Sequence, residues 1–155
     1  MKRTTSSHYS AAMAAKLAGL SRAMVNYLCR AELVVPSGQA RRGRGVRRRY
    51  TFGDIVALRL VADMCDAGIS PVRLKKALLR MRRVHPTIKL TSLSARRIAN
   101  DGRDILLRNK TDSLERLIDG QFTFAFVVEL ADIQREIRQK IERAIGARKT
   151  ARKTG

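Results

Sequence analysis

Residues 10–30 of the chain read SAAMAAKLAGLSRAMVNYLCR. Ser10 and Ser21 each stand directly before a helix-forming run, where a serine side chain can accept a hydrogen bond from a free N–H group of the first turn. Gly19 lies between the two runs and favours the end of a helix. The pattern predicts two short helices joined by a tight turn, which is the layout of a helix-turn-helix.

The second of these helices is amphipathic. Its polar and basic side chains recur every fourth residue, at Arg22, Asn26 and Arg30, while apolar residues occupy another face. In a helix-turn-helix, the exposed face of the second helix is the one that enters the major groove of DNA. The spacing therefore indicates a surface for nucleic acid.

A strongly basic segment follows at residues 37–50, which read SGQARRGRGVRRRY. We call this segment the basic loop. Its three glycines disfavour a helix and favour a hairpin. Six of its residues are arginines, so the loop predicts a basic wing beside the helix-turn-helix.

Two further helices are expected after the basic loop. Thr51 can cap a helix over 52–67, in which apolar residues recur at helical spacing. Gly68 favours the end of that helix. Pro71 can take the first position of the next helix, which is expected to reach about Met81.

Residues 9–80 resemble the mercury-resistance regulator (MerR) family of winged helix-turn-helix proteins. The matching residues, in the family's order and spacing, are AKLAGLS at 15–21, Leu33 with Pro36, RRYT at 48–51, Asp54-Ile55 with Leu58, and AGIS at 67–70 with Leu74. The resemblance implies a DNA-binding domain over 9–84. Its second helix would enter the major groove and its wing would grip the DNA backbone.

The resemblance also implies DNA contacts for individual residues. It makes Arg22, Asn26 and Tyr27 contacts of the second helix, Arg48 the arginine of the wing and Tyr50 the aromatic residue that follows it. Together with neighbouring polar and basic residues, the predicted DNA-binding set is Ser21, Arg22, Asn26, Tyr27, Arg30, Arg42, Arg44, Arg47, Arg48 and Tyr50.

The chain departs from the family pattern at two places. Asn-Tyr-Leu at 26–28 replaces an Arg-Tyr-Tyr-like run, and Glu32 stands where a glycine normally ends the second helix. An operator preference is therefore not carried over from any relative. By their chemistry, Asn26 suits a bidentate contact with adenine and Arg22 a contact with guanine.

The charge of the chain points to a polyanionic partner. The 155 residues include 33 Lys or Arg and 13 Asp or Glu, which gives a formal net charge of +20. This charge is clustered, with a net +7 over 22–49 and nine cations without an acid over 73–97. We expect some cations of the second block to contact a nucleic-acid backbone. A solvated helix face is the alternative.

Other classes of protein have little support in the sequence. No apolar run approaches the roughly 20 residues that span a bilayer, and the first residues lack the apolar core of a signal peptide. We therefore expect a cytoplasmic, nucleoid-associated protein without a membrane partner. Cys29 and Cys65 are expected to be reduced, and no cofactor or metal is expected because no ligand spacing occurs. A nucleophile, a base and an oxyanion donor cannot be assembled, so an enzyme is not expected.

The segment 85–128 predicts a small α+β unit. Asp101-Gly102, within residues 95–108, is a strong hairpin signal. The aromatic and β-branched run QFTFAFVV at 121–128 predicts a strand, and its phenylalanines favour a small core over stacking on bases.

From residue 129 the apolar period becomes helical and predicts an amphipathic helix over 129–147. Such a narrow stripe must be covered, either by the chain's own small β unit or by a second copy of the helix. MerR-like proteins dimerise through a helix in this place, so the predicted dimer interface is Leu130, Ile133, Ile137 and Ile141. The basic residues 148–155 are expected to be disordered.

These predictions combine into a mainly α fold with a small β part: an N-terminal winged helix-turn-helix, a small α+β segment and a C-terminal amphipathic helix. The expected function is transcriptional regulation by a homodimer that binds a pseudo-palindromic site in double-stranded DNA, and the family allows contact with RNA polymerase. An architectural factor such as a recombination directionality factor, or an RNA-binding protein, is the alternative. A small-molecule effector is left open.

Overall fold

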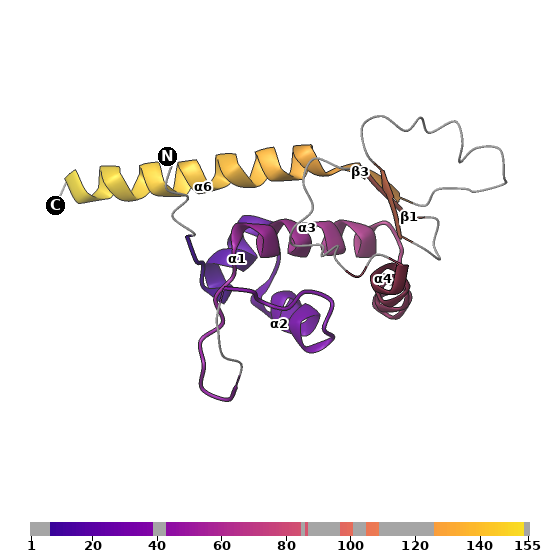
Figure 1. The fold of residues 1–155 in the computed structure, drawn as a ribbon. Helices are drawn as coiled ribbons and strands as arrows, with labels where there is room; N and C mark the ends of the chain where they lie inside the picture. Colours follow the sequence, from indigo (N-terminus) through magenta and orange to yellow (C-terminus); the bar gives the residue numbers. More distant parts are fainter. Residues whose placement is uncertain are drawn as a thin grey trace.

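Figure 1 shows the computed structural model of the chain, which describes residues 7–38, 43–84, 86, 97–100, 105–108 and 126–153. The described part is mostly helical, as predicted. In chain order its elements are α1 (Ala11–Ala18), α2 (Arg22–Arg30), α3 (Phe52–Asp66), α4 (Pro71–Val84), β1 (Arg97–Asn100), β2 (Ile105–Arg108), β3 (Phe126–Glu129) and α6 (Leu130–Lys153).

The predicted start and end of α1 and the predicted start of α2 are confirmed. The Ser10 hydroxyl accepts a hydrogen bond from the Met13 N–H at 3.2 Å, and the Ser21 hydroxyl accepts one from the Met24 N–H at 3.0 Å. Gly19 ends α1 in the left-handed region, with φ 71°. Local sequence signals therefore fix the turn that joins the two helices.

α2 ends in the same left-handed way but without a glycine. Glu32 has φ 58°. The Leu33 N–H returns to the Leu28 carbonyl at 3.0 Å, and the Glu32 N–H returns to the Cys29 carbonyl at 3.1 Å. These bonds satisfy carbonyls of the last turn, and they direct the chain from α2 toward the basic loop.

The three strands form an antiparallel sheet in the order β2-β1-β3. Asn100 pairs with Ile105 on one side and with Phe126 on the other. The expected Asp101-Gly102 turn lies outside the described residues. The strands before and after it, β1 and β2, pair antiparallel, as in a hairpin. Of the expected strand 121–128, residues 121–125 also lie outside them, and β3 ends at Glu129, one residue before α6 begins.

The helix α6 packs against α3 and α1 of its own chain. Leu130, Ile133 and Ile137 are all at most 5% exposed and belong to the same core cluster as α1 and α3. The guanidinium of Arg138 lies 5.3 Å from the centre of the Phe52 ring on α3. The prediction that these three apolar residues form a dimer interface is therefore wrong, because the chain's own helices cover them.

The predicted end of this helix is also corrected. α6 continues to Lys153, through most of the segment expected to be disordered from residue 148. The final turns contain Ala, Lys and Arg, which form helices readily. Cations at the C-terminus also interact favourably with the helix dipole, and Arg152 and Lys153 lie in the last turn.

Within the described part of the chain, no helix combines the length and apolar character needed to cross a bilayer.

Candidate nucleic-acid interface

The exposed face of α2 carries the residues that the sequence selected. Val25 and Leu28 point into the core, which leaves Arg22 and Arg30 exposed and Asn26 half-buried on the outer side. An open hollow of about 600 Å³ lies beside this face. Its lining brings α2 together with the start of α1 and with the basic loop: Ser10, Ala11, Ala12, Arg22, Asn26, Arg30, Arg47 and Arg48.

One hydrogen bond connects the basic loop directly to α2. The Nη1 atom of Arg48 donates to the Oδ1 atom of Asn26 at 2.7 Å. Arg48 is half-buried, whereas Arg44, Arg47 and Arg49 are exposed. The most enclosed of these four arginines thus donates this hydrogen bond to the second helix.

The described ends of the basic loop are joined by backbone hydrogen bonds. The Gly38 N–H donates to the Arg49 carbonyl at 3.0 Å, and Tyr9 and Tyr50 exchange two N–H to carbonyl bonds of 2.8 Å each. The two ends of the loop therefore lie side by side, next to Tyr9, which comes two residues before α1. Arg42 lies outside the described residues.

A buried carboxylate anchors the start of the basic loop to α3. Asp54 is fully buried and accepts hydrogen bonds from the Ser37 N–H, the Ser37 hydroxyl and the Thr51 N–H, each at 2.8 Å. Three donors satisfy a charge that would otherwise be costly to bury. Sequence analysis did not assign this role to Asp54, although Thr51 followed by an acid three residues later is the local signature of a capping box.

Residues 9–80 match the sequence model of the MerR HTH family of regulatory proteins. They belong to the MerR family. The same residues carried the predicted resemblance, and they include α1, α2, the basic loop, α3 and most of α4. This family consists of DNA-binding transcriptional regulators and not of enzymes, as the sequence predicted for this chain.

Curated relatives extend the similarity beyond this MerR domain. Uncharacterized HTH-type transcriptional regulators of Mycobacterium bovis and of two strains of Mycobacterium tuberculosis are each 32% identical to the chain over 126 residues. The alignment covers 77% of this chain and 52% of each relative. The chain thus spans about half the length of the curated relatives it matches.

One predicted contact of the MerR domain is corrected by its burial. Tyr50 is 0% exposed, and its hydroxyl has no hydrogen-bond partner within the described part of the chain. Burial raises the pKa of Tyr50 above its usual value, with a smaller contribution from nearby Cys29, and the Arg48 guanidinium opposes the rise. Tyr50 therefore supports the basic loop from the core and does not reach a DNA surface.

Part of the second cationic block, residues 73–97, lies on α4. The exposed cations of this helix include Arg73, Lys75, Lys76 and Arg80. The Lys75 ammonium lies 3.8 Å from the Glu32 carboxylate at the end of α2. In Figure 1, α2, the basic loop and α4 lie on one side of α3, and α6 lies on the other. The basic loop, α2 and the α4 cations of the second block therefore lie on the side of α3 away from α6.

Proposed function

We propose that the protein is a transcriptional regulator that binds a specific sequence of double-stranded DNA as a homodimer. The observation that carries the proposal is the hollow between α2 and the basic loop, whose lining, among the described residues, contains four arginines and no acid. Guanidinium groups pair with phosphate oxygens and with guanine edges. Asn26, in the same hollow, adds an amide that can discriminate between bases.

The contacts follow from this placement. The exposed face of α2 enters the major groove, and the basic loop acts as a wing against the phosphate backbone. The α4 cations extend the contact along the backbone. The proposed DNA-binding residues are Ser21, Arg22, Asn26, Tyr27, Arg30, Arg42, Arg44, Arg47 and Arg48.

The test is a selection of duplexes from a random library by the full chain, followed by affinity measurements at several salt concentrations. We expect one preferred sequence with two-fold symmetry, and a loss of discrimination at one base pair in Arg22→Ala. Arg135→Ala is the control, because this exposed arginine lies on α6. Equal binding of structured RNA and the selected duplex at physiological salt would contradict the proposal.

The role of the binding is tested by mapping the bound sites in a genome. Promoter sites are expected for a regulator, with activation through RNA polymerase or repression depending on where the operator lies. Attachment sites for recombination would instead support an architectural factor. As a DNA-binding regulator, the protein is expected in the cytoplasm, at the nucleoid.

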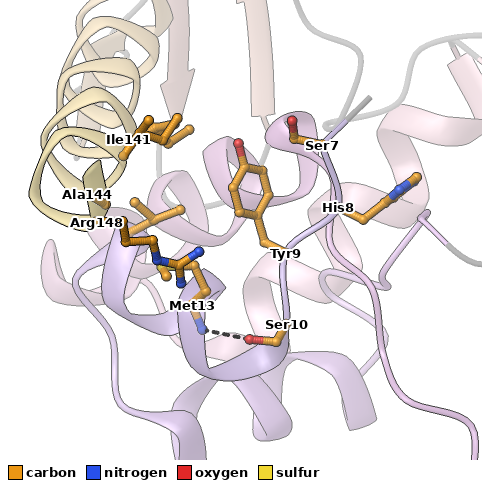
Figure 2. A pocket seen from close by; sticks show the side chains of 10 residues that line it. Ser7, His8, Tyr9, Ser10, Met13, Ile141, Ala144 and Arg148 are labelled. Atoms are coloured by element: carbon orange, nitrogen blue, oxygen red, sulfur yellow. Dashed lines mark hydrogen bonds between the residues drawn. The ribbon is translucent and has the colours of Figure 1, made fainter. Parts of the chain in front are cut away.

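The homodimer is proposed through the second half of α6. The apolar stripe continues past the core to Ile141, which is half-buried, and Ile145, which is 51% exposed. Figure 2 shows Ile141 and Ala144 of α6 across a pocket from Tyr9 and Met13. This pocket has a volume of about 340 Å³. The α6 helix of a second copy would cover this uncovered end of the apolar stripe. The two α2 helices of the dimer would then face the same side of the DNA, roughly 34 Å apart or a multiple of that distance.

Sedimentation of the full chain tests the dimer. Ile145→Asp is expected to shift the protein toward the monomer while leaving the fold intact, since this side chain is exposed. Ala147→Asp, at an exposed position on the opposite face of the same helix, is the matched control, because it changes the charge by the same amount. A dimer that persists in Ile145→Asp would remove this end of α6 from the interface.

A further inference from the structure

The contact between Arg48 and Asn26 fixes the orientation of an amide side chain in the hollow. A side-chain amide presents an oxygen on one branch and an NH₂ group on the other, and rotation by half a turn exchanges them. The Arg48 guanidinium holds the Asn26 oxygen at 2.7 Å, on the side of the basic loop. Within the described residues, the Asn26 NH₂ group has no hydrogen-bond partner, so it is available to a ligand.

Arg48 is itself held in place by the backbone on which it stands. Immediately after it, the Arg49 carbonyl accepts the Gly38 N–H, and Tyr50 exchanges two backbone bonds with Tyr9. The buried Tyr50 ring then fixes this segment to the core. The backbone that carries the guanidinium is therefore itself held by hydrogen bonds and by core packing.

We propose that Arg48 is a positioning residue that sets the base specificity of Asn26. This inference rests on the proposed function. An amide distinguishes base pairs in the major groove by the places of its donor and acceptor, so an amide that turns freely discriminates less. The arginine thus couples the basic loop to the sequence that α2 reads, in addition to any attraction between its charge and phosphate.

Arg48 and its neighbour Arg47 are expected to have different effects on DNA binding. Both side chains line the same hollow and carry the same charge, but Arg47 is exposed and does not hold Asn26. Loss of Arg47 should weaken binding to all duplexes alike and reduce the salt dependence by about one charge. Loss of Arg48 should also change which base is preferred at one position.

The experiment measures the affinity of the full chain for its selected duplex and for all single base-pair changes in one half-site. Asn26→Ala identifies the position that the amide reads. Arg48→Met is expected to lower discrimination at that same position by about tenfold, a typical worth of a good base contact. Arg47→Met, the matched control, should leave the preference unchanged. In Asn26→Ala/Arg48→Met, the second substitution should have no further effect on preference.

Two results would overturn the inference while leaving the proposed function standing. In one, Arg48→Met weakens all duplexes by the same factor. In the other, Arg48→Met changes the base preference by the same amount in the wild-type chain and in the Asn26→Ala variant. A wild-type chain with no preference among duplexes would overturn the proposed function itself. Thermal unfolding of each variant distinguishes a lost contact from a lost fold.

Discussion

The Arg59 guanidinium on α3 lies 3.4 Å from the Glu136 carboxylate on α6. The same guanidinium forms an ion pair with Asp63 at 2.9 Å, and Lys140 lies 3.1 Å from Glu136. Arg59 also donates to the Ala18 carbonyl, at the end of α1, at 3.5 Å. One arginine thus ties together three of the helices that contribute to the core, and it fixes α6 on the MerR domain.

Glu136→Gln should weaken this attachment at neutral pH. The hydrogen bond from Lys140 holds the pKa of Glu136 below its usual value, and the Arg59 charge acts in the same direction. A lowered folded-state pKa means that the stabilisation is complete at neutral pH and is lost as the pH falls through that pKa. Because Glu136 is nearly half exposed, the loss should stay below about 1 kcal/mol.

Chemical unfolding at neutral and acidic pH checks this prediction. The difference in unfolding free energy between wild type and Glu136→Gln should shrink on acidification and at high salt. Asp132→Asn is the control, because within the described residues its carboxylate pairs along α6, with Arg135 at 3.3 Å, and not with another helix. A difference that does not depend on pH would show that the charge of Glu136 is not what matters.

Tyr50→Phe should stabilise the protein. The hydroxyl of this buried residue lies near the Arg48 guanidinium but meets no partner at hydrogen-bonding distance and angle within the described chain, and an unsatisfied buried donor costs about 1–3 kcal/mol. Its removal should raise the free energy of unfolding by about 1 kcal/mol, measured by chemical denaturation, and leave DNA affinity unchanged. A fall in DNA affinity without a loss of stability would return Tyr50 to the set of DNA contacts.

Local signals made the helix-turn-helix predictable from the sequence. The caps at Ser10 and Ser21 and the turn at Gly19 each depend on residues within a few positions. The face of α2 follows from the spacing of Arg22 and Asn26 in the same way. Physical rules that act within one or two turns of helix therefore sufficed for this part of the fold and for the exposed side of the site.

Long-range contacts explain what the sequence did not predict. The apolar stripe on α6 predicted that one face of this helix is buried. The helices that bury it, α1 and α3, are far away along the chain. The burial of Tyr50 likewise depends on pairing with Tyr9, and the contact between Arg48 and Asn26 joins separate elements. No periodicity within a single element encodes such pairs.

Gly38→Ala should disrupt the base of the basic loop. A Cβ atom at this position would lie 2.5 Å from His8 Cδ2 and 2.6 Å from the Arg49 carbonyl oxygen, so backbone must move. We expect a loss of about 1–3 kcal/mol in stability, as for other overpacked sites, and weaker DNA binding because Arg48 would be displaced. Denaturation and duplex titration measure the two effects.

Gly43→Ala is the matched control for this change, within the same loop. Among the described residues, a Cβ atom there would meet only the Val46 side chain, at an ordinary 3.9 Å. Its stability and DNA affinity should stay close to wild type. Equal effects from both substitutions would mean that general stiffening of the loop matters, and not the close approach at Gly38.

Glu32→Gly should stabilise the protein by relieving the backbone at the end of α2. Glu32 is the one described residue other than glycine with a positive φ, at 58°, a conformation that costs an L-residue about 1–2 kcal/mol. The substitution also removes the ion pair with Lys75, but that pair is exposed and 3.8 Å long, so it contributes little.

Glu32→Ala separates the two effects, because it removes the charge and keeps the Cβ atom. Denaturation should give a gain of about 1 kcal/mol for glycine relative to alanine at this position. Equal stability of the two variants would mean that the left-handed backbone at residue 32 is not strained.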